Sequence, residues 1–279
     1  MVRVQFIFAI FLSIPAAYGQ NLFDEENTRK YAEYLYQRGK FALAIPEYER
    51  LIYFNPDSEV YQAQLLESYF NIEAYDKIAQ TIPVWYPDSI RYPISLYLLK
   101  TTLKTGTYQE AYNILDNETR YQFPSEQVPV LRMVTYGLAS DWKKAAGLCN
   151  NTPPIDQEAD FARYCQIVTS AAEFKPKNKL LAAGLSTLVP GLGKVYTRDY
   201  IDAAVNFLFI GVTAFQAYRG FSNDNINDLQ GWIYGGVALS FYLGNIYGSW
   251  RAADQYNYRF YEDKRQELDR SFFSGQPLE

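Results

Sequence analysis

The residue types that could do chemistry are few in this chain of 279 residues, which has no histidine and only two cysteines. Without histidine there is no Ser-His-Asp or Cys-His catalytic arrangement, no His-ligated zinc or iron and no histidine pH switch. Two cysteines are also too few for a Cys-only zinc site or an iron–sulfur cluster. We therefore expect no metal site and no cofactor.

Carboxylates are the strongest remaining catalytic candidates, because paired Asp and Glu side chains can act as general acid and base. Two such pairs, Glu25-Glu26 and Asp57/Glu59, come where helices or repeat loops are expected to begin. The helix dipole stabilises negative charge there, so these pairs need no catalytic explanation. A carboxylate-dependent hydrolase is thus the weakest of the hypotheses, and we expect that the protein is not an enzyme.

The net charge limits the class of partner, and the two cysteines bear on the cellular compartment. A net charge of −5 argues against nucleic acid as a partner, because phosphate binding relies on clustered cations. Cys149 and Cys165 could form a disulfide in an oxidising compartment. Both lie on predicted helices, where a free cysteine is often a small buried apolar residue. The sequence leaves these two alternatives open.

The first 19 residues are typical of a secretory signal peptide. Arg3 gives the positive start, residues 6–14 are apolar, and Ala17-Tyr18-Gly19 places small residues at the cleavage positions. The apolar stretch is too short for a spanning helix, which needs about 20 residues. We expect cleavage after Gly19 and export, most simply to a bacterial periplasm. An uncleaved N-terminal anchor is the alternative.

A repeated phrase occupies residues 25–150. Its aromatic member recurs at Phe41, Tyr75, Tyr108 and Trp142, in steps of 34, 33 and 34 residues. A Gly-type position just before each aromatic is expected to end one helix in a left-handed or flexible conformation. Such a period predicts stacked helix pairs. The segment 37–58 resembles a tetratricopeptide repeat, which implies an all-α helical-repeat solenoid over 20–174.

In that family the first helix of each pair lines an inner groove that binds peptides. Carried over to this sequence, the resemblance implies a protein partner and a groove lined by Glu33, Tyr36, Glu67, Phe70, Lys100 and Leu103. A C-terminal carboxylate is a poor ligand for this set. A peptide with apolar anchors and some positive charge fits better. The alternative is that the aromatic residues and Leu103 pack inside the solenoid.

Composition changes at about residue 175, after the basic segment 175–179. Three stretches then lack charge, 180–193, 203–218 and 230–250. The last is long enough to span a bilayer, and the second becomes so when its flanks from Ile201 through Phe221 are included. We predict a membrane helical hairpin over 175–252, led by a shorter half-helix. A buried helical pair in a soluble protein is the alternative.

Small and polar residues within the hairpin are expected to lie between helices. The glycines at four-residue spacing allow close backbone approach: Gly231, Gly235, Gly244 and Gly248. Asn206, Gln216 and Asn245 should face another helix, because an unbonded amide is costly in hydrocarbon. The structural role outweighs a substrate path.

The segment 186–196 carries a sharper motif, with Pro190, Gly191, Gly193 and Tyr196 in Pro-Gly-x-Gly-x-x-Tyr order. With Asp202-Ala203 following, it resembles the entry of bacterial two-transmembrane-helix domains, although Lys194 replaces the usual Gln. The resemblance implies membrane residence and lipid contact without catalysis. The tail, 253–279, is charged and aromatic and is expected to be a solvated helix.

Two functional hypotheses remain open from the sequence. The first is a membrane-anchored periplasmic adaptor that mediates protein–protein interaction in assembly of the bacterial cell envelope. The second is a membrane component whose hairpin does the work, aiding insertion, secretion or transport. Fold alone does not decide between them.

Overall fold

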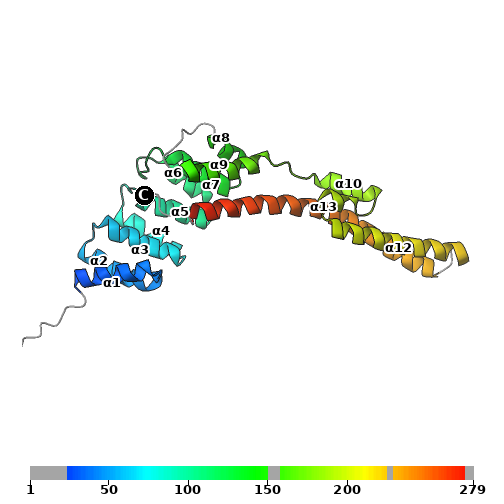
Figure 1. Cartoon of the computed structure of the whole chain (residues 1–279), viewed down its shortest axis with the longest axis horizontal. Helices are drawn as coiled ribbons and strands as arrows, with labels where there is room; N and C mark the ends of the chain where they lie inside the picture. The colour runs from blue at the N-terminus through cyan, green and yellow to red at the C-terminus, as the bar shows by residue number, and fades with distance from the viewer. Residues whose placement is uncertain (1–23, 150–157, 225–228, 274–279) are drawn as a thin grey trace, which may run out of the picture. The chain divides into compact units, whose positions relative to one another are not determined.

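The computed structural model describes residues 24–149, 158–224 and 229–273. Every regular element in these ranges is an α-helix, so the all-α prediction is confirmed there (Figure 1). The predicted signal peptide, 1–19, lies outside the described residues. The chain divides into two compact units, the first reaching Thr105 and adding Glu118–Phe123, the second holding the remainder.

Unit 1 contains five helices within its described residues: α1 (Glu25–Gln37), α2 (Phe41–Phe54), α3 (Glu59–Asn71), α4 (Tyr75–Trp85) and α5 (Ile94–Lys104). Consecutive helices pack on one another, and α3 also packs on α5. Their contact faces are apolar at helical spacing, as with Ala44, Tyr48 and Leu51 on α2. Burial of these faces away from water is the main stabilising force in this unit.

The turns between paired helices follow the repeated phrase. Gly39, Glu73, Gly106 and Ser140 stand two residues before the four aromatic members, and each has a positive φ, of 66°, 60°, 73° and 65°. The left-handed conformation ends one helix and lets the backbone start the next within three residues. Glycine meets this need at the lowest cost, and Glu73 and Ser140 adopt the same conformation without it.

Unit 2 holds the other helices: α6 (Tyr108–Asp116), α7 (Val128–Leu138), α8 (Trp142–Cys149), α9 (Glu158–Glu173), α10 (Lys179–Leu188), α11 (Leu192–Tyr196), α12 (Tyr200–Asp224) and α13 (Leu229–Phe273). Figure 1 shows α13 as one unbroken helix, with α10 and α12 beside its first half. α12 and α13 run antiparallel, since Phe221 meets Gly231 and Phe209 meets Phe241. We call these two helices the α12–α13 pair.

The second half of α13 is not a separate solvated tail. Leu268 is fully buried, and an added Cβ at Gly137 of α7 would collide with it. Phe174, just after α9, stacks on Phe260 with ring centroids 3.7 Å apart. The sequence did not anticipate this docking, because the apolar residues of 253–273 are sparse and their partners lie about 100 residues earlier. α13 thereby joins the predicted repeat region and the apolar region into one unit.

The two compact units do not follow the predicted repeat boundary. The third copy of the repeat comprises α5 and α6, and these helices fall in different units. The predicted boundary at residue 175 falls inside unit 2, because α13 packs on both α9 and α10. Each unit therefore contains part of the repeated sequence.

Candidate functional site

Three of the six predicted groove residues, Tyr36, Glu67 and Lys100, lie together in unit 1, and the carboxylate of Glu67 interacts with the other two. Tyr97 donates a hydrogen bond from its hydroxyl to Oε2 of Glu67, over 3.0 Å. Burial raises the pKa of Tyr36, and a hydrogen bond to Glu67 raises it further. Burial lowers the pKa of Lys100, while the charge of Glu67 acts in the opposite direction. We call Tyr36, Glu67, Tyr97 and Lys100 the Glu67 cluster.

The other three predicted groove residues are engaged elsewhere. Glu33 accepts a hydrogen bond from Arg29, 2.9 Å away on the same helix. Phe70 packs edge-on against Tyr75, with ring centroids 5.4 Å apart. Leu103 is 4% exposed and belongs to the core, so it offers a ligand almost no surface. For Leu103 the structure favours the alternative of interior packing. Tyr97 was missed, although its place three residues before Lys100 puts it on the same helix face.

The glycines of the Pro-Gly-x-Gly segment are required by close backbone packing in unit 2. Gly191 is left-handed, with φ of 86°, and an added Cβ would collide with the carbonyl oxygen of Ala203. A Cβ at Gly193 would collide with the carbonyl oxygen of Ala182. Pro190 immediately precedes this turn. The turn thus brings α10, α11 and the start of α12 into backbone contact.

A buried polar network ties this turn to α13. Oδ1 of Asn245 accepts a hydrogen bond from the backbone N–H of Gly191, over 3.1 Å. The hydroxyls of Ser186 and Ser249 are 2.6 Å apart, and the N–H of Gly193 donates to Ser186. Asn245 was expected to face another helix and does so. The two serines were missed, because a serine in an apolar helix carries no distinct sequence signal.

Two further contacts hold the same junction. Nζ of Lys194 lies 3.0 Å from Oδ2 of Asp202, and the Lys194 side chain is only 11% exposed. The hydroxyl of Tyr196 accepts a hydrogen bond from the backbone N–H of Asn178, over 3.1 Å. These two contacts hold the linker before α10, the turn and the start of α12 against one another. Asn206, by contrast, donates only to the carbonyl of Asp202 in its own helix.

The predicted packing glycines of α13 fall on two faces. A Cβ added at Gly231 would collide with the ring of Phe221, and one added at Gly235 would lie 3.9 Å from Cβ of Ala217, both on α12. A Cβ added at Gly248 would lie 3.6 Å from Cε of Lys194. An added Cβ at Gly244 would meet nothing within 4 Å, so this glycine packs on no neighbour. Its prediction as a packing residue is wrong because no described residue comes against that position of α13.

Within the described residues, α12 alone is long and apolar enough to cross a membrane, over Tyr200–Ser222. Only 22% of its most apolar 18-residue window is buried in the structure. The stretch 230–250, expected from its lack of charge to span as well, does not reach the same hydropathy. The reason is that glycine, serine, tyrosine and asparagine are uncharged without being strongly apolar.

The two cysteines meet between α8 and α9. A disulfide joins Cys149 and Cys165, whose Cα atoms are 5.6 Å apart. It closes a loop across the segment 150–157, which lies outside the described residues. In the part of the chain that the structure describes, no three His, Cys, Asp or Glu side chains come together as a metal-ligand set.

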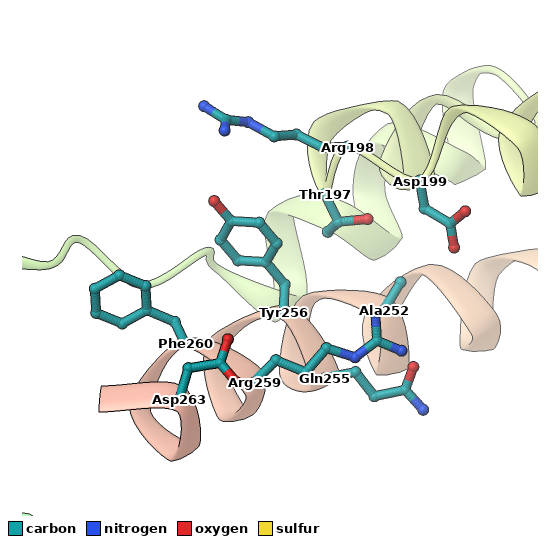
Figure 2. Close-up of a pocket in the computed structure, with 9 residues that line it drawn as sticks. All are labelled: Thr197, Arg198, Asp199, Ala252, Gln255, Tyr256, Arg259, Phe260 and Asp263. Atoms are coloured by element: carbon teal, nitrogen blue, oxygen red, sulfur yellow. The ribbon is translucent and has the colours of Figure 1, made fainter. Parts of the chain in front are cut away.

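An open pocket lies between the turn after α11 and the middle of α13 (Figure 2). Its volume is about 510 Å³. Figure 2 shows that Thr197, Arg198 and Asp199 come from the turn, while the other side chains rise from α13. Two guanidinium groups and two carboxylates line it, from Arg198, Arg259, Asp199 and Asp263. We call this the Arg198–Arg259 pocket. Sequence reasoning missed it, because its two halves are about 60 residues apart.

Comparison with known proteins gave no family model, no curated protein and no solved structure that matches this chain.

Proposed function

We propose that this chain is a membrane-anchored adaptor of the bacterial cell envelope, whose repeat region binds a protein partner and whose α12–α13 pair forms a membrane hairpin. The observation that carries the anchor is the exposed apolar surface of the pair. A core helix of a soluble protein would have its apolar side chains buried, whereas α12 buries only 22% of its most apolar window.

The exposed side chains of the pair are large and apolar. Each of the following is more than half exposed: Val205, Phe207, Leu208, Val212, Phe215, Trp232, Ile233, Leu239 and Leu243. Exposure of this surface to water costs roughly 25 cal/mol of free energy for each Å². Hydrocarbon removes that cost.

The interior of the same region suits lipid as well. In hydrocarbon, helices associate through small residues and interhelical hydrogen bonds, because the hydrophobic effect no longer separates core from surroundings. Asn245, Ser186 and Ser249 supply such bonds. Gly231 and Gly235 supply close approach to α12. Lys177 lies over the ring of Tyr196, and Lys179 lies over the ring of Trp250. Such aromatic and basic side chains fit the band where a spanning helix leaves the bilayer.

The disulfide supports export. A bond between Cys149 and Cys165 persists in an oxidising compartment and is rare in the cytosol. Together with the signal-like segment 1–19, it favours a periplasmic location for the repeat region. Thiol titration of the unfolded protein, taken from membranes without reductant, should find no free thiol. Two free thiols would remove this support.

The adaptor role rests on the resemblance to tetratricopeptide repeats and on the Glu67 cluster. Glu67 and Tyr36 stand on consecutive first helices, as the family's groove requires, and Lys100 follows on the third. A carboxylate ringed by tyrosines suits a peptide that brings a positive charge beside an apolar anchor. The partner is a protein of the cell envelope in this proposal.

The anchor is tested by alkaline carbonate extraction of membranes that contain the full chain. We expect the protein to stay in the pellet and to be released by mild detergent. Release by carbonate alone would contradict the anchor. The adaptor role is tested by affinity purification from detergent-solubilised envelopes, comparing the native chain with Glu67→Gln. Equal recovery of every partner by the two would remove the Glu67 cluster from the proposal.

A working hairpin, aiding insertion, secretion or transport, is favoured by one observation. Lys194 is a charged side chain almost completely buried among apolar helices, and such residues often mark a substrate path. Replacing the membrane segment with an unrelated anchor separates the two functions. If the repeat region still recovers its partners and supports growth under envelope stress, the hairpin is only an anchor. If partner recovery persists while the cellular function is lost, the second function is favoured.

A further inference from the structure

Three sulfur atoms meet where α7, α8 and α9 pack together in unit 2 (Figure 1). Sδ of Met133, on α7, lies 3.4 Å from Sγ of Cys149 and 3.8 Å from Sγ of Cys165. The two cysteines come from the end of α8 and from α9. Since disulfide sulfur carries no hydrogen, these are direct sulfur–sulfur contacts. We call Met133, Cys149 and Cys165 the sulfur cluster.

The cluster gathers nearly all the sulfur of the chain. The sequence has two cysteines and two methionines, and the second methionine is Met1. The other buried apolar side chains that the structure describes are aliphatic or aromatic, so the one methionine among them lies against both cysteines. Counting histidines and cysteines alone could not reveal this arrangement, because its third member is a methionine.

Close packing one helical turn away fixes the positions of the three sulfur atoms. Gly137 lies four residues after Met133, on the same face of α7. A Cβ added at Gly137 would lie 3.3 Å from the Val168 side chain of α9 and 3.6 Å from the Trp142 ring of α8. Met133 itself has no exposed surface, so its thioether is held in the core. Ligand atoms held in this way lose little conformational entropy when they bind.

We propose that the sulfur cluster, in its reduced state, binds the soft cation Cu(I) through two thiolates and one thioether. Thiolate and thioether sulfur favour Cu(I) over hard cations. For a metal–sulfur bond of about 2.3 Å, three sulfur atoms around one ion lie about 4 Å apart. The distances of 3.4 and 3.8 Å from Met133 to the two cysteines are already close to that spacing.

The ligand set distinguishes Cu(I) from zinc. Zn²⁺ in a structural site takes four ligands from Cys, His, Asp and Glu side chains. Within the described residues, no carboxylate joins the two cysteines as a third ligand of this kind, and the chain has no histidine. Two thiolates and a thioether are therefore too few for zinc, while their softness suits Cu(I).

Reduction of the disulfide is the step that opens the site. Neither Cys149 nor Cys165 is fully buried, so an external thiolate can attack the bond. The reductant is a dithiol, which gives the cysteines two electrons and two protons and itself becomes a disulfide. Cu(I) then replaces both thiol protons, and the complex carries one net negative charge. The oxidised pair offers no thiolate, so its redox state controls metal binding.

The test uses the full chain in mild detergent. Half of the preparation is reduced without oxygen by dithiothreitol, which is then removed by gel filtration, and the other half keeps its disulfide. Cu(I) is supplied as its coloured complex with bicinchoninate, and loss of the colour measures transfer to the protein. We expect one Cu(I) per reduced chain and none per oxidised chain. No uptake by the reduced chain, or equal uptake by the oxidised chain, would overturn the proposal.

Met133→Leu separates a three-sulfur site from a simple pair of thiols. Leucine has nearly the same volume, so the core should keep its packing. We expect the reduced variant to hold Cu(I) about tenfold more weakly, because one soft ligand is lost. Leu131→Ile is the matched control, because Leu131 is a buried residue of the same helix without sulfur, and it should keep the native affinity. Native affinity in the Met133 variant would overturn the three-sulfur site.

A selenium label gives a second measurement that does not depend on the folding of a variant. With Met133 as selenomethionine, X-ray absorption at the copper edge should show one selenium and two sulfur neighbours. Copper with sulfur neighbours alone would overturn the proposal, whatever the Met133 variant does. Cu(I) binding in detergent requires neither the membrane anchor nor a protein partner, so this inference and the proposed function can fail separately.

Discussion

Unit 1 and the region from α10 to the first half of α13 differ in which apolar side chains they bury. In unit 1 the fully buried side chains are large and mostly apolar, such as Leu51, Leu66 and Leu99. In the α10–α13 region the buried apolar side chains are mostly alanines, such as Ala182, Ala203 and Ala217, while most of the large apolar side chains are exposed. The two regions belong to one chain but distribute their large apolar side chains in opposite ways.

This difference is the one expected between a region that folds in water and a region that folds in hydrocarbon. In water, apolar burial stabilises a fold and polar groups can stay outside. In hydrocarbon, apolar side chains lose nothing by exposure, and polar groups must find partners inside. The Asn245 amide and the Ser186–Ser249 pair fulfil that second requirement. Substitutions in each region test whether the two regions obey these two rules.

The largest effect is expected from a charge on the outer face of α12. Val212→Asp places a carboxylate near the middle of the candidate span, which costs about 3 kcal/mol in a bilayer. Val60→Asp on α3 is the matched control, because the two valines are 59% and 63% exposed. Carbonate extraction should release the Val212 variant and retain the Val60 variant. Equal behaviour would mean that both faces meet water.

Next comes an added methyl group at the glycine turn. Gly193→Ala should destabilise the α10–α13 region by about 2 to 3 kcal/mol, because its Cβ collides with backbone atoms of Ala182. Gly244→Ala is the control, since its Cβ meets nothing within 4 Å. Unfolding in mixed detergent micelles, followed by circular dichroism, measures both. Equal stability of the two variants would contradict the close packing of the turn.

A smaller effect is expected from the buried amide. Asn245→Leu leaves the N–H of Gly191 without its partner and should cost about 2 kcal/mol, even though leucine is more apolar. Asn206→Leu removes only a bond within its own helix and should change stability by no more than about 0.5 kcal/mol. The same unfolding assay compares the two variants. A more stable Asn245 variant would show that this interior tolerates apolar packing as unit 1 does.

The smallest effect belongs to unit 1 and depends on pH. Burial, with the charge of Glu67, raises the pKa of Tyr97 above its ordinary value of 10.0. The unfolded chain therefore loses this proton first, so the contribution of Tyr97 is intact below pH 10 and declines as the pH rises further. Tyr97→Phe should cost about 1 kcal/mol at pH 7 and make the alkaline loss of stability less steep.

Chemical unfolding of the full chain between pH 7 and 11 measures this effect. Tyr53→Phe is the control at pH 7, because Tyr53 is 82% exposed and should contribute little. An alkaline loss that is equally steep in the native chain and the Tyr97 variant would contradict the role of the Glu67 cluster.

Local features were predictable from the sequence because they depend on neighbouring residues. The repeated phrase placed the left-handed turns at Gly39 and Gly106, where the backbone reverses between helices. The Pro-Gly-x-Gly segment marked a tight turn, and the uncharged stretch around Ile210 marked the long apolar helix α12. The amide of Asn245 was expected to face another helix because hydrocarbon leaves it no other partner.

Contacts between distant segments were not predictable in the same way. The periodicity of α5 did not show whether Leu103 faces a groove or the core, since a leucine suits either environment. Lack of charge overstated the hydropathy of 230–250, and spacing by four did not reveal that no described neighbour lies against Gly244.

By itself the sequence determined the helical character of the chain, its left-handed turns and the apolar nature of α12, because helix period, glycine conformation and hydropathy are local properties. Only the tertiary structure decided that α13 continues to Phe273 and docks through Leu268, and that Arg198 shares a pocket with Arg259. Those arrangements depend on which helix faces meet, and the free energy of that choice is spread over residues far apart in the chain.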